Sequence, residues 1–350
     1  MLEYRLNEFK GPESLTLTEV PTPTPGSSQV LVKVHAVSLQ YRDLMVAQGK
    51  FPMPVKPGTV PCSDMAGEIV AVGSSVDPTQ FSVGDRICAN YVMPGSVLGD
   101  LGAEIDGVLA QFKVFEADPD RLVRFPAHLS YREAAALPCA AATAHAALFG
   151  PVPVKRGDVV LVQGTSGVSI LTLQLAVAAG AIVILTSSSD EKLAVGVELG
   201  AQHTINYART PKVDEEVMKI TNGRGADVVI DIGGLASLVQ SMKACAFGGW
   251  VQIVGVMVHT PVDLEQIPIL AIMKHLCMRG VVIGGMARLK AANAFIEAQD
   301  VHPYVDPREF PFGQAPDAYR YMSSQTRVGK VVIQVADSEQ RIEPRNVNFI

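Results

Sequence analysis

The stretch VLVQGTSGVSI, residues 160–170, decides the fold of this chain. One apolar run ends in Gly164 and another begins after Gly167, so the pattern predicts a strand, a tight turn and a helix over 168–179. Such a turn gathers unpaired helix N–H groups and the positive end of the helix dipole, which suits a pyrophosphate. A strand–turn–helix without a ligand has the same pattern, so the loop alone is weak evidence. The candidate binding residues are Gly164, Ser166, Gly167 and Val168.

Apolar strands and helices alternate downstream of residue 158. Helices are predicted over 191–199, 213–221 and 235–246. Strands that are apolar on both faces and separated by helices belong in a parallel sheet covered on both sides. About six of them predict an α/β, doubly wound dinucleotide-binding fold. The predicted strands are VVLVQ, IVILT, HTIN, DVVIDI, WVQIVGV and MRGVVIGG.

The first 125 residues have a different sequence pattern. Short β-rich runs such as VLVKVHAVSL and MAGEIVAVG alternate with Gly and Pro, which predicts a barrel-like β domain. The tail after residue 288 ends in VGKVVIQV, a strand that we expect to rejoin this first domain. A chain of 350 residues is long enough for two domains. We therefore predict a β domain over 1–125, completed by 288–350, and a nucleotide-binding domain over 126–287.

The end of the second predicted strand bears on the cofactor. An acidic residue there would bind the ribose hydroxyls of NAD, but the sequence is ILTSSSDEK, with Ser187, Ser188 and Lys192. Hydroxyls and a lysine would bind a 2′-phosphate, which a carboxylate would repel. We therefore expect NADP(H) rather than NAD(H). The alternative is a serine N-cap with a solvated lysine, and the two interpretations are compatible because a cap and a phosphate use the same N–H groups.

Composition narrows the class of protein. Apolar residues make up 48% and charged residues 18%, and the net charge of −6 gives no reason to expect nucleic-acid binding. The most apolar window, ILTLQLAVAAGAIVIL, is interrupted by polar residues and is shorter than the roughly 20 residues of a membrane span. Five scattered cysteines and a charged N-terminus without an apolar core predict a cytoplasmic protein with free thiols.

The whole chain resembles the medium-chain dehydrogenase/reductase superfamily. The matching motifs run in the family's order from about residue 20 to 335 and include VPCSDMAGEIVAVG, FSVGDRI, AAALPCAAATAHAAL, VQGTSGVS and GKVVI. The resemblance implies a GroES-like β-barrel catalytic domain, completed by the C-terminal tail, around a Rossmann nucleotide-binding domain. The active site would lie in the cleft between them.

Two departures from the zinc-dependent members of that family are evident. Their catalytic zinc ligands correspond to Gln40, Ser63 and Cys139, and only the last could bind zinc well. The four cysteines of their structural-zinc lobe have no counterpart. The chain therefore looks more like the zinc-free quinone oxidoreductase and enoyl reductase branches, in which NADPH delivers hydride to a conjugated carbon of a small molecule.

The resemblance also implies roles for single residues. Tyr41 and Gln40 are the candidates for the polar wall of the cleft, although Tyr41 could simply pack against the barrel, and quinone oxidoreductases commonly have Asn where Gln40 stands. Enoyl reductases can use a Tyr where this chain has Phe51, so no proton donor is copied directly. Thr143 corresponds to a threonine near the nicotinamide, and Tyr207 to a tyrosine near the adenosine phosphate.

Rival functions and the assembly stay open at this point. A metal-free carbonyl or alcohol dehydrogenase is the second enzyme hypothesis, and a catalytically idle NADPH-binding structural or sensor protein is the third. Substrate identity is expected to depend on residues 90–107 and on residues near 257–272, and no motif in these stretches indicates a particular substrate. The resemblance implies a homodimer in which MRGVVIGG strands pair.

Overall fold

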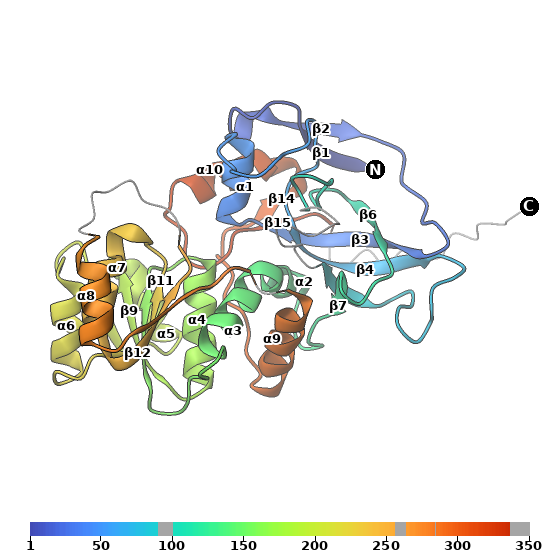
Figure 1. The fold of residues 1–350 in the computed structure, drawn as a ribbon. Helices are drawn as coiled ribbons and strands as arrows, with labels where there is room; N and C mark the ends of the chain where they lie inside the picture. The colour runs from blue at the N-terminus through green and yellow to red at the C-terminus, as the bar shows by residue number, and fades with distance from the viewer. Residues whose placement is uncertain (90–100, 256–263, 284, 337–350) are drawn as a thin grey trace, which may run out of the picture.

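The computed structural model describes residues 1–89, 101–255, 264–283 and 285–336, and shows two lobes, each built on its own sheet (Figure 1). One lobe holds a six-stranded parallel sheet in the order β10-β9-β8-β11-β12-β13. The strand order changes direction between β8 and β11, which places a ligand crevice at the carboxyl ends of these strands. The strands are β8 (Val159–Gln163), β9 (Ile182–Ser187), β10 (His203–Asn206), β11 (Ala226–Asp231), β12 (Cys245–Ile253) and β13 (Cys277–Gly280).

Helices cover both faces of this sheet because its strands are apolar on both sides. In β8, Val160 and Val162 pack into the core beneath α4 and α5, whereas Val159 and Leu161 pack beneath α6 and α7. The predicted doubly wound α/β fold is therefore confirmed. No helix within the described ranges is long and apolar enough to cross a bilayer. The helices are α4 (Gly167–Ala178), α5 (Asp190–Glu198), α6 (Val213–Ile220), α7 (Leu235–Ala244) and α8 (Gln266–Met273).

The other lobe holds a seven-stranded sheet in the order β14-β15-β3-β4-β5-β7, with β6 also paired to β3, and a separate β1-β2 hairpin. The strand expected in the tail, β15, pairs antiparallel with the end of β3, Val332 opposite Ser38. The domain boundaries at 125 and 288 stay a prediction. The strands are β1 (Leu2–Leu6), β2 (Leu15–Glu19), β3 (Gln29–Ser38), β4 (Asp64–Val72), β5 (Arg86–Ala89), β6 (Phe112–Glu116), β7 (Leu122–Arg124), β14 (Phe310–Pro311) and β15 (Val332–Gln334).

An alanine-rich junction, residues 134–147, connects the lobes. Its buried alanines belong to the same apolar core as the nucleotide sheet and as Ala36, Ala66 and Cys88 of the barrel. Because these side chains are small, the helices can approach the sheet closely. The π-helical turn η2 brings Leu137, Ala140 and Ala141 into this core and buries Cys139. The remaining helices are α1 (Tyr41–Ala47), α2 (Tyr131–Ala135), η2 (Leu137–Ala141), α3 (Ala142–Leu148), α9 (Met286–Ala298) and α10 (Ala315–Ser323).

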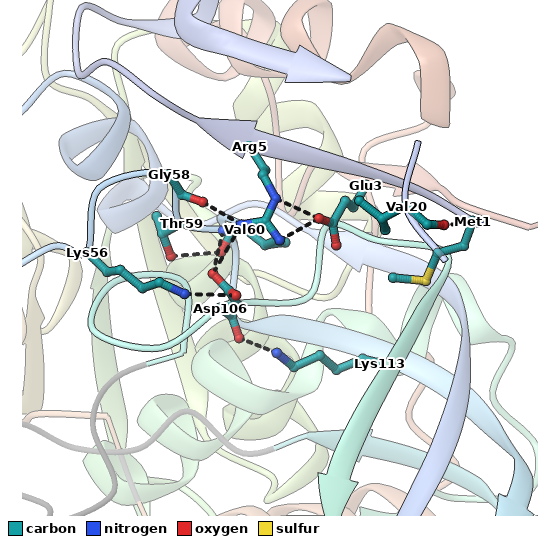
Figure 2. A network of polar contacts seen from close by, with 10 residues as sticks. All are labelled: Met1, Glu3, Arg5, Val20, Lys56, Gly58, Thr59, Val60, Asp106 and Lys113. Carbon is teal, nitrogen blue, oxygen red and sulfur yellow. Dashed lines mark hydrogen bonds and ion pairs between the residues drawn. The ribbon is translucent and has the colours of Figure 1, made fainter. Parts of the chain in front are cut away.

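A polar network on the barrel holds β1 against two loops (Figure 2). Arg5 pairs with Glu3 and donates to the Gly58 carbonyl at 2.8 Å. Asp106 accepts from Lys56 at 3.0 Å through its carboxylate, and from Lys113 at 2.6 Å through its carbonyl. Glu3, Arg5, Asp106 and Lys113 border a hollow of about 300 Å³ that shares no lining residue with the site described next. Because each charged side chain of the network is engaged by an opposite charge or a carbonyl, the network acts as structural support.

Candidate functional site

The predicted nucleotide loop lies between β8 and α4, at the crevice end of the sheet. Gly164 has φ +71°, a conformation that favours glycine and turns the chain sharply after the strand. Ser166 caps α4, its Oγ accepting from the Ser169 N–H at 3.5 Å. The helix begins at Gly167, one residue earlier than predicted, so Gly167 and Val168 form its first turn, where helix N–H groups lack intrahelical partners.

A C-terminal segment, residues 325–330, forms the opposite wall of this loop. Gly329 donates its N–H to the Thr165 carbonyl at 2.9 Å and pairs with Ser166 as a β-bridge. A Cβ atom on Gly167 would lie 2.4 Å from Cδ of Lys330, so the absence of a side chain at position 167 allows the lysine to cross the loop. Sequence reasoning assigned this segment only to a strand and missed its place in the site.

The end of β9 carries the residues predicted to choose the cofactor. Ser187 is buried beside β10, and its carbonyl accepts from the Tyr207 N–H at 3.0 Å. Ser188 is exposed, and so is the Tyr207 ring. The predicted serine N-cap of the next helix is Ser189, whose Oγ accepts from the Lys192 N–H at 3.4 Å. Ser188 and Tyr207 thus present their hydroxyl-bearing side chains toward solvent beside the strand end.

Two cations from different lobes converge near this strand end. Lys192 on α5 donates its ammonium to the Gln325 carbonyl, and Arg327 donates to the Met322 carbonyl at 2.7 Å. Burial lowers the pKa of Lys192, and the nearby Arg327 charge lowers it further. Burial also lowers the pKa of Arg327. The charge of Asp306 acts in the opposite direction and raises the pKa of both groups, so one carboxylate already lies near the two cations.

The acidic residues of the first turn of α5 are already engaged. Asp190 pairs with Arg209 and accepts from the Asn206 amide at 2.8 Å. Glu191 accepts a hydrogen bond from the Ser189 hydroxyl. Neither carboxylate is therefore left unpaired beside the two converging cations.

A buried polar network joins the start of α1, the start of β4 and the segment before β15. The Gln40 amide donates to Ser63 Oγ at 2.5 Å and to Asp64 Oδ1 at 3.1 Å. Ser63 donates to the same Asp64 oxygen at 3.1 Å, and the Lys330 ammonium donates to Asp64 Oδ2 at 2.9 Å. Asp64 is fully buried and Lys330 is 5% exposed. Because both amide hydrogens of Gln40 are used, its side chain supports the wall instead of offering a free donor.

Tyr41 is placed differently from its neighbour. It is the first residue of α1 and is 43% exposed, and its hydroxyl makes no hydrogen bond within the described part of the chain. Burial is the main influence on the pKa of Arg327, and proximity to Tyr41 acts in the opposite direction by raising it, which places the phenol near that guanidinium. Thr143, on α3, is buried and donates to the Cys139 carbonyl of η2 at 2.7 Å, so its hydroxyl proton is already engaged.

Lys330 connects the two groups of predicted residues. Its stem crosses the nucleotide loop at Gly167, and its ammonium binds Asp64, which in turn holds Gln40. Sequence reasoning missed Asp64, Lys330 and Arg327. The lysine of the GKVVI motif was the available signal, because a charged residue at the start of an apolar strand needs a partner when it is buried. Substrate identity is predicted to depend on 90–107 and on residues near 257–272. The parts of these stretches within 90–100 and 256–263 lie outside the described residues.

Comparisons with known proteins agree with this architecture. Residues 26–127 match the model of the alcohol dehydrogenase GroES-like domain, and residues 167–298 match that of the zinc-binding dehydrogenase domain. A zinc-type alcohol dehydrogenase-like protein of Schizosaccharomyces pombe is 40% identical over 94% of this chain and 97% of its own length. The quinone oxidoreductase of Mus musculus is 30% identical over 95% of this chain and 97% of its own length.

A solved structure described as an NAD-dependent alcohol dehydrogenase superimposes with a TM-score of 0.86, at 30% identity, over 96% of this chain and all of that one. Both lobes and their order along the chain are thus shared with a protein described as an NAD-dependent alcohol dehydrogenase. The chain belongs to the medium-chain dehydrogenase/reductase superfamily.

Proposed function

We propose that this protein is an NADPH-dependent, zinc-free reductase of small conjugated carbonyl compounds, such as enones, quinones or enoyl derivatives. The buried network of Gln40, Ser63, Asp64 and Lys330 carries the proposal, because it fills the positions where zinc-dependent relatives have their ligands. Without a Lewis acid to stabilise an alkoxide, reduction of an already electron-poor carbon is the more natural reaction.

The residues at those positions do not fit a zinc ion. An amide and a hydroxyl replace two expected ligands, and they hydrogen-bond each other at 2.5 Å. Cys139 has the right atom, but burial raises the pKa of its thiol to about 12, whereas zinc binds the thiolate. The Lys330 ammonium also places a positive charge on Asp64, which would repel a second cation.

The preference for NADPH rests on the residues at the end of β9. The solved alcohol dehydrogenase relative is NAD-dependent, so the choice has to come from this chain's own side chains. Ser187 stands where a carboxylate would bind ribose hydroxyls, and Lys192 and Arg327 converge on that end of the strand. We propose that Ser188, Tyr207 and these two cations hold the 2′-phosphate, while Gly164, Ser166, Gly167 and Val168 hold the pyrophosphate.

The cofactor, when bound, supplies the hydride. The protein then has to place the acceptor carbon and stabilise the charge that develops on the carbonyl oxygen. We assign this donor role to the exposed Tyr41 hydroxyl. Gln40 is a positioning residue, since its amide holds Ser63 and Asp64 and so fixes the start of α1. Thr143 would lie beside the nicotinamide as a packing residue.

An NADPH-oxidation screen tests the proposal. Purified enzyme is assayed with quinones, enones and saturated aldehydes, and in reverse with ethanol-like alcohols, before and after treatment with a chelator. We expect turnover of the conjugated substrates only, with kcat unaffected by chelation. Alcohol oxidation that survives the chelator would favour a metal-free alcohol dehydrogenase. NADPH binding without any turnover would favour the idle binding protein.

We also propose a homodimer formed through β13. This strand lies at the end of the six-stranded sheet, and exposed apolar side chains surround it, with Ile272 and Met273 70% exposed or more. An apolar edge strand left open is an aggregation hazard that a second copy would remove. Light scattering on a size-exclusion column should give a dimer mass, and Met278→Arg should give a monomer. Val83→Arg, at an exposed barrel position, is the matched control.

A further inference from the structure

Two histidines and an aspartate meet on the surface where α9 ends, in a cluster that the proposed reaction does not use. One potential ligand atom from each of His128, Asp300 and His302 lies within 4.8 Å of the other two. The imidazole rings are 5.0 Å apart between centroids and cross at 73°, so they do not stack. His128 precedes α2, whereas Asp300 and His302 follow α9, so distant segments build the cluster.

The segment after α9 is held firmly in place. Val301 is buried in the shared core, whereas Asp300 and His302 on either side of it are exposed, so these two side chains lie outside the core. The Gln174 amide on α4 donates to the His302 carbonyl at 2.7 Å and accepts from the Tyr304 N–H at 2.9 Å. His128 is held to the same segment, with Nε2 3.2 Å from the Val301 carbonyl.

A carboxylate orients one of the imidazoles. Glu133 Oε1 lies 2.7 Å from Nδ1 of His302, which leaves Nε2 of that ring directed away from the carboxylate. Burial alone would raise the pKa of Glu133, but hydrogen bonds from Ser130 and His302 outweigh it and lower the pKa. A carboxylate on the far nitrogen of a histidine is the usual support of a metal-binding imidazole.

We propose that His128, Asp300 and His302 bind one zinc ion, with Glu133 as the residue that positions His302. Two imidazoles and a carboxylate suit a divalent transition metal, whereas calcium and magnesium prefer oxygen ligands alone. Water would complete the coordination. The ion would tie the loop before α2 to the end of α9, beside the alanine-rich junction. This site is separate from the catalytic position and does not depend on the proposed function.

Zinc titration of metal-stripped protein tests this site. All proteins carry Cys277→Ser, because that thiol is exposed and would bind zinc itself. The protein is treated with EDTA, desalted and titrated with zinc chloride by calorimetry, and its melting temperature is measured with and without zinc. We expect one zinc per chain and a higher melting temperature with zinc. Activity should be the same with and without the ion.

Variants decide whether the cluster is responsible. His128→Ala or His302→Ala should weaken zinc binding by at least about tenfold, and Glu133→Gln should weaken it by a comparable factor. His203→Ala, an exposed histidine on β10, should leave it unchanged. If His302→Ala does not fold, His302→Gln replaces it. Equal zinc affinity in the parent and the His128→Ala/His302→Ala double variant would overturn the proposal, as would a melting-temperature rise that persists in that double variant.

Discussion

The residues proposed to bind the cofactor phosphate and those proposed to form the catalytic wall are built in opposite ways. At the proposed phosphate end, Lys192 and Arg327 each donate to a carbonyl oxygen near the Asp306 carboxylate, and Ser188 is exposed. At the proposed catalytic end, Gln40 and Lys330 are buried. Gln40 donates to Ser63 and Asp64, and Lys330 donates to Asp64. Lys192 and Arg327 can therefore still bind an anionic ligand. Gln40, Asp64 and Lys330 satisfy one another's hydrogen-bonding groups without a ligand, so substituting them should affect stability more than binding.

Breaking the buried ion pair should have the largest effect. Lys330→Met leaves the Asp64 carboxylate buried without its counterion, which should cost about 3–5 kcal/mol of unfolding free energy. Urea denaturation followed by fluorescence measures the loss. The Lys330→Met/Asp64→Asn double variant removes both charges and should recover most of it. A single variant that loses less than about 1 kcal/mol would show that water already screens Asp64.

Tyr41→Phe should separate catalysis from binding, because the Tyr41 phenol lies near Arg327, a residue proposed to bind the cofactor. Removing one hydrogen-bond donor to the developing oxyanion should lower kcat by roughly ten- to a thousandfold, or about 2–4 kcal/mol at the upper part of that range. NADPH affinity, measured by fluorescence titration, should stay nearly unchanged. A variant with full kcat would mean that Tyr41 only lines the cleft.

Ser187→Asp should act at the phosphate end and move the preference from NADPH toward NADH. A carboxylate there would meet the 2′-phosphate at close range, and each lost charge-assisted hydrogen bond costs about 1.5–3 kcal/mol, or tenfold or more in affinity. Ser187→Ala is the matched control, because it removes the hydroxyl without adding charge. Unchanged NADPH affinity in the aspartate variant would refute the assignment of Ser187.

Asp43 makes the catalytic end sensitive to pH. Burial raises the pKa of this carboxyl to about 6, although the Arg42 charge and the Gln40 N–H lower it. The folded state therefore holds the proton more tightly than the unfolded chain, and the protein loses stability as the pH rises from about 4 to about 6. The unfolding free energy of Asp43→Asn relative to the wild type should increase by about 1–2 kcal/mol when the pH is raised from 5 to 7.5, as measured by urea titrations. Parallel pH profiles would contradict the buried-carboxyl explanation.

Lys192→Ala should have the smallest effect, no more than about 1 kcal/mol in NADPH binding, because salt screens a partly exposed cation. Its affinity loss should shrink at high ionic strength and should be absent with NADH. Arg327→Gln should act in the same direction from the opposite wall. If Arg327→Gln weakens NADH and NADPH equally, the guanidinium supports the wall and does not read the 2′-phosphate.

The sequence predicted best what short segments determine. HTIN forms β10 over the predicted residues, with Ile205 packed into one core, and the nucleotide loop follows from one glycine-bounded turn. The helix predicted over 235–246 ends at Ala244, because pairing with β11 draws the chain into β12 from Cys245. Asp64 and Lys330 stand 266 positions apart, so no local pattern could join them. The GKVVI motif indicated a strand but not the partner of its lysine.

The pairing of β15 with β3 also sets an order of events during synthesis. Ser38 meets Val332 only after the whole six-stranded sheet has left the ribosome. The nucleotide sheet is continuous in sequence and can close on its own, while the nascent barrel waits with an open edge at the end of β3. The interval between those two moments is therefore when this chain is most exposed to misassembly, and when a chaperone would find its binding site.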